Sequence, residues 1–125
     1  MPLSKNDLRD FSSLHRKTKR HELGLFIVEG KKNCMELVKS NFEVVCICTT
    51  VPNNSDFVDA TQITAKEATR ISHLKNPSPY MAIAKIPKSD FKIEKKPILF
   101  YLDHINDPGN LGTIVRTLDW FGFNQ

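Results

Sequence analysis

The sequence predicts an α/β fold, because short apolar runs typical of strands alternate along the chain with segments of helical character. The apolar runs lie at residues 25–28, 44–50, 80–84 and 98–102. Their lengths match ordinary strands, and the second is rich in β-branched residues. Up to residue 86 the expected order is α-β-α-β-α-β, which favours a small three-layer α/β domain.

Capping signals place two of the expected helices. Ser4 followed by Asp7, and Thr64 followed by Glu67, have the spacing of a capping box. The apolar side of the first helix would consist of Leu8, Phe11 and Leu14. The apolar side of the second helix would consist of Ala68, Ile71 and Leu74. A further helix is expected at residues 31–39. Glu29 precedes it and is predicted to act as a helix-start residue rather than as a catalytic acid or base.

The closing segment has the pattern of a strand, a tight turn and a helix. Residues 98–102 are apolar without alternation, as in a strand buried on both faces of a parallel sheet. Pro108 and Gly109 break this run, and Asn110 is suited to cap the helix that follows. At 100° per residue, one side of that helix is apolar and should face the sheet. This side consists of Leu111, Ile114, Val115, Leu118 and Phe121. The opposite side collects Asn110, Thr113, Arg116, Thr117 and Trp120.

Spacing alone leaves the role of these polar groups open. Ligands bind to open α/β sheets at the carboxyl ends of strands, where this helix begins. Equally, Asn110 can be only a cap and Arg116 only a solvated charge, since strand-turn-helix units are common.

The positive charge of the chain is concentrated near its N-terminus. Residues 1–32 hold eight basic and four acidic side chains, whereas the remainder holds ten of each, so the whole net charge of +4 lies in the first segment. The densest part, residues 15–21, is suited to phosphate contacts. A solvated charged face or a flexible arm explains the charge equally well.

Other features narrow the class of protein. Cys34, Cys46 and Cys48 form no Cys-x-x-Cys pair, so we expect reduced thiols and no metal site, with Cys46 and Cys48 on one strand face. No apolar run has the length of a membrane helix, and the N-terminus does not resemble a signal peptide. We therefore expect a cytoplasmic protein without membrane contact.

Two motifs resemble one known family. Residues 107–117 read Asp-Pro-Gly-Asn-Leu-Gly-Thr-Ile-Val-Arg-Thr and resemble the first conserved motif of SpoU-type (TrmH-like) 2′-O-ribose RNA methyltransferases of the SPOUT superfamily. Residues 20–30 read Arg-His-Glu-Leu-Gly-Leu-Phe-Ile-Val-Glu-Gly and look like the signature of that family's N-terminal domain. The two motifs occur in the expected order, and together they identify the chain as resembling the N-terminal part only of such a protein.

The resemblance implies a domain organisation. Residues 1–86 would form an L30e-like RNA substrate-binding domain, residues 87–97 a linker, and residues 98–125 the first strand-turn-helix of a knotted SPOUT methyltransferase domain. It also implies that Asn110 and Arg116 belong to the active site, with Arg116 activating the ribose 2′-hydroxyl. Arginine is normally always protonated, so it would act as a base only in an unusual environment, and otherwise would orient groups or bind phosphate.

The implied reaction transfers a methyl group from S-adenosylmethionine to a ribose 2′-hydroxyl of ribosomal or transfer RNA. The family's donor-binding motifs have no counterpart in the sequence, so we expect no cofactor-binding residue in this chain and no activity of the chain alone. A homodimer is expected for the full-length protein. The expected RNA-binding residues are basic side chains of the N-terminal segment, namely Arg16, Lys17, Lys19, Arg20, Lys31 and Lys32. The alternative is a non-catalytic L30e-like RNA-binding module.

Overall fold

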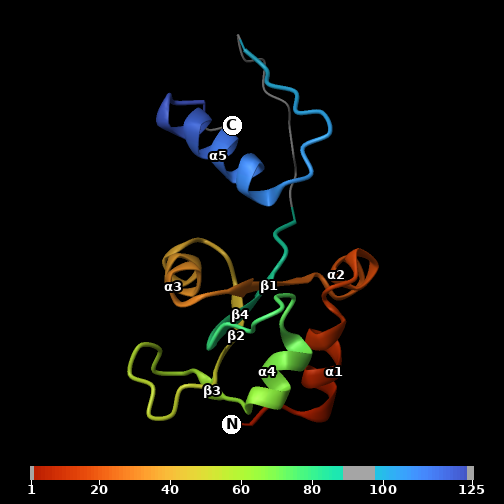
Figure 1. Cartoon of the computed structure of the whole chain (residues 1–125), viewed down its shortest axis with the longest axis vertical. Coiled ribbons are helices and arrows are strands. Elements are labelled where there is room, and N and C mark those ends of the chain that lie inside the picture. Colours follow the sequence, from red (N-terminus) through yellow and green to blue (C-terminus); the bar gives the residue numbers. More distant parts are fainter. Residues whose placement is uncertain (1, 89–97, 124–125) are drawn as a thin grey trace. The chain divides into compact units, whose positions relative to one another are not determined.

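The structure of the protein is a computed structural model that describes residues 2–88 and 98–123. The chain divides into two compact units, Met1–Ser89 and Asp90–Gln125, and each is described by itself (Figure 1). Of the predicted linker 87–97, residues 89–97 lie outside the described residues. The predicted domain boundaries therefore stay predictions.

The first unit is built on a four-stranded sheet with the strand order β1-β4-β2-β3. Its strands are β1 (Leu25–Glu29), β2 (Val44–Thr49), β3 (Thr61–Gln62) and β4 (Tyr80–Lys85). β4 runs antiparallel to both β1 and β2, whereas β2 and β3 are parallel. The three longer strands lie where the apolar runs predicted them. β3 was not predicted, because two residues are too short to show a period.

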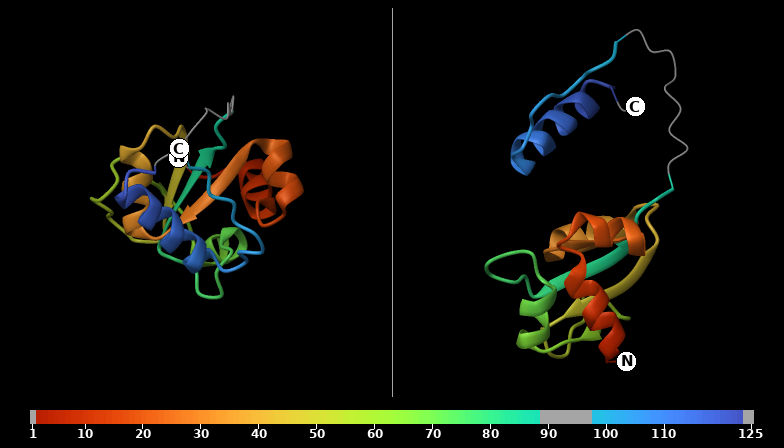
Figure 2. Two further views of the ribbon diagram at one scale, coloured as in Figure 1. Left: turned by 90° about the horizontal axis from the view of Figure 1, so that it is seen from above. Right: turned by 90° about the vertical axis from the view of Figure 1, so that its right-hand side faces the viewer.

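Helices cover both faces of this sheet (Figures 1 and 2). On one face, α3 (Lys31–Lys39) packs its buried Cys34 and Leu37 in a cluster with residues of β4. On the other face, α1 (Lys5–Ser13) and α4 (Ala65–Ile71) lie side by side over a second cluster that contains Phe11, Leu14, Ile71, Met81 and Ile83. The predicted three-layer α/β architecture is confirmed.

The basic segment forms a helix that the sequence analysis did not predict. α2 spans Lys17–Leu23 and ends at Gly24, whose φ of +64° is the left-handed conformation that glycine adopts readily. No residue of α2 is buried. The basic residues are therefore carried by an ordered surface helix and not by a flexible arm.

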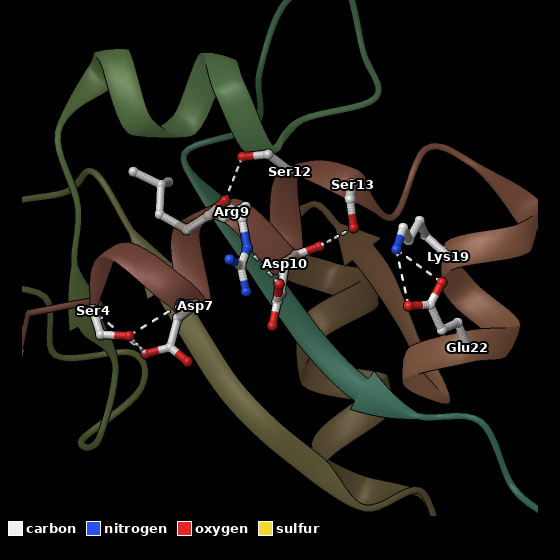
Figure 3. A network of polar contacts seen from close by, with 9 residues as sticks. Ser4, Asp7, Arg9, Asp10, Ser12, Ser13, Lys19 and Glu22 are labelled. Atoms are coloured by element: carbon white, nitrogen blue, oxygen red, sulfur yellow. Dashed lines mark hydrogen bonds and ion pairs between the residues drawn. The ribbon is translucent and has the colours of Figure 1, made fainter.

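Both predicted capping boxes are present. At α1 the backbone N–H of Asp7 donates to Ser4 Oγ (3.0 Å), and the Ser4 N–H donates to Asp7 Oδ2 (3.1 Å) (Figure 3). At α4 the N–H of Thr64 donates to Glu67 Oε2 (2.7 Å), while the Glu67 N–H donates to Thr64 Oγ1 (3.2 Å). The backbone and hydroxyl bonds from Thr64 lower the pKa of Glu67. Each box satisfies donors that the first turn of a helix leaves free.

The second unit contains α5 (Pro108–Trp120) but lacks the predicted strand. Residues 98–102 form no strand, and their side chains are exposed. A strand needs a neighbouring strand to pair its backbone groups, and the described residues of this unit contain none. For the same reason the apolar stripe of α5 does not face a sheet: Ile114 and Leu118 are half-buried, and the rest of the stripe is exposed. Among the described helices, none combines the length and apolar character needed to cross a bilayer.

Two of the three cysteines meet on β2, as their spacing predicted. The sulfur atoms of Cys46 and Cys48 lie 3.6 Å apart, within hydrogen-bonding distance. The bond from Cys48 lowers the pKa of Cys46 to about 7, and the same contact together with burial raises the pKa of Cys48. Burial raises the pKa of Cys34 to about 11. Nowhere in residues 2–88 and 98–123 do three His, Cys, Asp or Glu side chains gather as a metal site would require.

The buried side chain of Ile83 provides a test of the core. Ile83 is 0% exposed at the centre of β4, so Ile83→Ala should lower the free energy of unfolding by about 2–5 kcal/mol, because it removes buried methylenes and leaves a cavity. Urea denaturation followed by circular dichroism measures this loss. The control is Val58→Ala, at a side chain that is 95% exposed, with an expected change below about 0.5 kcal/mol. Equal losses in both variants would contradict the packing described.

The thiols should differ in reactivity. Cys46 is half-buried and has a lowered pKa, so its alkylation by iodoacetamide should rise as the pH passes about 7 and should precede that of buried Cys34 and Cys48. Mass spectrometry of the modified peptides gives the order. Cys48→Ala removes the thiol donor and should shift the rise in Cys46 reactivity to higher pH. An unshifted pH profile in this variant would refute the hydrogen bond as its cause.

Candidate nucleic-acid interface and catalytic helix

The turn between α1 and α2 presents two exposed cations. Arg16 is the N-cap residue of α2 and Lys17 its first residue, and both side chains are exposed. Neither forms an ion pair with a residue in the described part of the chain. These two predicted RNA-binding residues are therefore available to an anionic partner.

The other two predicted basic residues of α2 already have partners in the protein. Arg20 Nη1 donates to the backbone oxygens of Leu14 (2.9 Å) and His15 (3.0 Å), just past the end of α1. It thus satisfies carbonyl groups that helical bonding leaves free. Lys19 pairs with Glu22 one turn further along α2, at 2.8 Å (Figure 3). An exposed pair of this kind is weak, so Lys19 can exchange it for another anion, whereas Arg20 has a structural role.

Lys31 is also engaged, at the start of α3. Its Nζ lies 2.7 Å from Asp56 Oδ1 and 5.9 Å from the centre of the Tyr80 ring. Asp56 in turn accepts a hydrogen bond from the Tyr80 hydroxyl at 2.6 Å. The bond between Lys31 and Asp56 raises the pKa of the lysine and lowers that of the carboxyl group. Lys31 therefore ties α3 to the segment after β2, while Lys32 is exposed beside it.

Glu29 does not act as a helix-start residue, contrary to the prediction. It is the last residue of β1, and the N-cap of α3 is Gly30, with a φ of +103°. The Glu29 carboxylate accepts hydrogen bonds from Ser72 Oγ (2.5 Å) and from the backbone N–H of His73 (3.0 Å). It therefore fastens the segment that follows α4 to the end of β1. The sequence carries no signal for a contact between residues 43 positions apart.

This contact brings separate segments to one edge of the domain. His73 lies beside His15, with ring centroids 6.4 Å apart and the rings perpendicular. His15 immediately precedes Arg16, and Glu29 lies just before the start of α3. The α1–α2 turn and the segment after α4 therefore lie side by side, next to the end of β1. We call the exposed group of His15, Arg16, Lys17, His73 and Leu74 the two-histidine surface.

The start of α5 corrects the expected role of Asn110. The N-cap is Asp107, whose Oδ2 accepts the backbone N–H of Asn110 at 2.7 Å. Pro108 follows at the first helical position, where its fixed φ suits the helix and no N–H is needed. Asn110 is therefore in the first turn and not at the cap. The sequence Asp107-Pro108, rather than Asn110, therefore marks where the helix begins.

Four of the five predicted polar-face residues come together on α5. Thr113, Arg116, Thr117 and Trp120 line a shallow depression of about 270 Å³, and Asn110 is not among them. The two threonine hydroxyls donate to backbone oxygens of the preceding turn, Thr113 to Gly109 (2.9 Å) and Thr117 to Thr113 (2.8 Å). The guanidinium of Arg116, which is exposed, is thus the charged group of this face.

The chain matches known proteins over most of its length. Residues 5–82 match the family described as MRM3-like substrate binding domain. The chain is 27% identical over 122 residues to the 23S rRNA (guanosine(2553)-2′-O)-methyltransferase RlmP of Bacillus subtilis, covering 94% of this chain and 48% of that protein.

Solved structures agree with this match. A putative RNA methyltransferase of the TrmH family from Porphyromonas gingivalis superposes with a TM-score of 0.67 and 31% identity, over 98% of this chain and 50% of that one. The SpoU methyltransferase AviRb from Streptomyces viridochromogenes, solved with its cofactor AdoMet, superposes with a TM-score of 0.64 over 96% of this chain and 51% of that one. At 20% identity, the second likeness shows the fold alone.

The chain spans about half the length of the relatives it matches. The resemblance to SpoU-type (TrmH-like) RNA methyltransferases that the two motifs indicated is confirmed by these matches. The family match covers the three-layer domain from α1 into β4. The chain therefore belongs to the family of MRM3-like substrate-binding domains.

Proposed function

We propose that the chain is the RNA-recognition part, with the first catalytic motif attached, of an S-adenosylmethionine-dependent 2′-O-ribose methyltransferase of ribosomal or transfer RNA. The observation that carries the proposal is the match of residues 5–82 to a family described as a substrate-binding domain. The relative from Bacillus subtilis is named as a 23S rRNA 2′-O-methyltransferase, which favours ribosomal RNA as the substrate. Such a substrate also favours the cytoplasm as the location.

RNA binding rests on the exposed cations of the first unit. Arg16 and Lys17 lie at the α1–α2 turn without ion-pair partners among the described residues, and Lys32 is exposed on α3. Cations of this kind gain affinity by releasing the counterions that surround RNA phosphates. Lys19 contributes when it exchanges Glu22 for phosphate, whereas Arg20 and Lys31 chiefly hold the surface in shape.

The described residues do not fit the methyl donor. The depression on α5 is lined by side chains of a single helix, so it is open and has no second wall to enclose S-adenosylmethionine. The AviRb structure contains the donor, whereas the described residues of this chain offer it no enclosed site.

Arg116 is the proposed catalytic residue, and Asn110 the second proposed active-site residue. The planar guanidinium can bind a phosphate in a bidentate manner and so orient the neighbouring ribose, or in a desolvated site it can assist removal of the hydroxyl proton. The backbone N–H of Asn110 is used by Asp107, and its exposed side-chain amide is left for the substrate. Homodimerisation of the full-length protein is also proposed, from the family resemblance alone.

The second candidate is a non-catalytic RNA-binding module of the L30e-like kind. One observation favours it: the family match ends at residue 82, before α5 begins. In that case the two-histidine surface would still bind RNA, and Arg116 would have no part in a reaction.

RNA binding is tested at Arg16 and Lys17, which lack ion-pair partners in the part of the chain that the structure describes. The double variant Arg16→Gln/Lys17→Gln should weaken binding to a short RNA hairpin, and the slope of log K against log salt should become shallower by about two, one for each lost phosphate contact. Fluorescence anisotropy across a salt series measures both effects. Lys31→Gln is the matched control, because its cation already pairs with Asp56. A salt slope that changes equally in both variants would contradict the assignment.

The second prediction concerns Arg116 in the full-length protein. Arg116→Ala should lower the rate of methyl transfer from S-adenosylmethionine to RNA by about 100-fold or more, with an unchanged circular dichroism spectrum. Arg116→Lys keeps the charge but loses the planar fork, so its rate should also fall. Asp119→Asn, at an exposed position on the same helix, should keep the wild-type rate. Near-normal turnover by Arg116→Ala would contradict the catalytic role of Arg116, whereas absence of turnover in the wild-type full-length protein would favour the non-catalytic alternative.

A further inference from the structure

The two-histidine surface joins aromatic and apolar groups to cations that have no ion-pair partner within residues 2–88 and 98–123. The rings of His15 and His73 lie 6.4 Å apart and perpendicular, and both side chains are exposed. Leu74, next to His73, leaves 55% of its surface exposed. Arg16 and Lys17 continue the chain directly from His15. Aromatic faces beside cations are the usual means by which proteins bind single-stranded nucleic acid.

Both histidines are held by side chains from other elements. Arg20 from α2 binds the backbone oxygens of Leu14 and His15. Glu29 from β1 binds Ser72 and the backbone N–H of His73. The two backbone segments that carry the rings are therefore fixed before any ligand arrives, which reduces the entropy lost on binding.

The hydrogen bond of the His15 ring and the pKa of the His73 ring are compatible with stacking of a base on these rings. His15 Nδ1 lies 2.9 Å from the backbone oxygen of Ser12, and since a carbonyl oxygen only accepts, Nδ1 carries the hydrogen. Partial burial lowers the pKa of His73, with the nearby cation Arg20 and His15 acting in the same direction and Glu29 opposing them. The lowered pKa favours the neutral form of the His73 ring.

We propose that His15, His73 and Leu74 form a platform for an unpaired RNA base, while Arg16 and Lys17 hold the adjacent phosphates. This inference rests on the proposed RNA-binding function and narrows its substrate to a loop, bulge or other single-stranded segment. Bases in a duplex are stacked inside the helix and cannot reach such a platform, whereas splayed bases of loops stack on aromatic side chains, including histidine.

The test compares two RNA probes with the full chain. One is a hairpin with an unpaired loop, and the other is a fully paired duplex of the same stem sequence. The wild-type chain should bind the hairpin more tightly. His15→Ala/His73→Ala should lose about five-fold or more in hairpin affinity, because it removes the rings on which the base stacks, and its duplex affinity should not change. His15→Phe/His73→Phe should keep the preference, because the phenyl rings still stack.

His21→Ala is the matched control, because His21 is also exposed on α2 but lies outside the two-histidine surface. It should leave the affinity for both probes unchanged. Equal wild-type binding of hairpin and duplex, or an unchanged preference in the double alanine variant, would overturn the platform. Loss of the preference in the phenylalanine variant would overturn stacking as its basis. None of these results affects the assignment of Arg16 and Lys17 to phosphate binding, which is tested separately by the salt dependence of Arg16→Gln/Lys17→Gln.

Discussion

Burial of β4 on both faces is the constraint on which the rest of the first unit depends. β4 pairs with β1 on one side and β2 on the other, so its backbone bonds hold the sheet together. Its side chains alternate between the two clusters of the core: Met81 and Ile83 meet α1 and α4, while Ala82 and Ala84 meet α3. The small alanines allow α3 to approach the sheet closely, and the larger residues fill the wider space under the helix pair.

The arrangement of the two-histidine surface follows from how the backbone groups at the helix ends above this core are hydrogen-bonded. Helices that pack on a sheet leave carbonyl groups and connecting segments at the sheet edge, and these need polar partners. Arg20 supplies donors at the end of α1, and Glu29 supplies acceptors for the segment after α4. Arg20 and Glu29 are used in this way, whereas Arg16 and Lys17 beside them have no ion-pair partner among the described residues. Hydrogen bonding to backbone groups thus determines which charged side chains remain available to bind another molecule.

The sequence predicts elements with a local signal and misses those without one. The capping boxes at Ser4 and Thr64 are local patterns, and both appear in the structure. α2 was missed because its residues show no apolar periodicity. It is stabilised instead by Gly24 at its end and by the contacts of Arg20 with the end of α1. The prediction of a strand at residues 98–102 was wrong. An apolar run indicates that a segment can form a strand, but a strand also requires a neighbouring strand with which its backbone can pair.

The candidate site shows the same division between local and distant information. A motif can name the residue types of a site, as it does for Arg116, and a charge count can find a basic segment. Neither reveals that Lys31 pairs with Asp56, or that Glu29 reaches Ser72 across 43 positions. Six basic residues look equivalent in the sequence, but the fold uses Arg20 and Lys31 internally and leaves Arg16 and Lys17 without such partners among the described residues. Contacts between residues far apart in the sequence therefore determine which cations of this surface can bind an anion, and only the three-dimensional structure reveals these contacts.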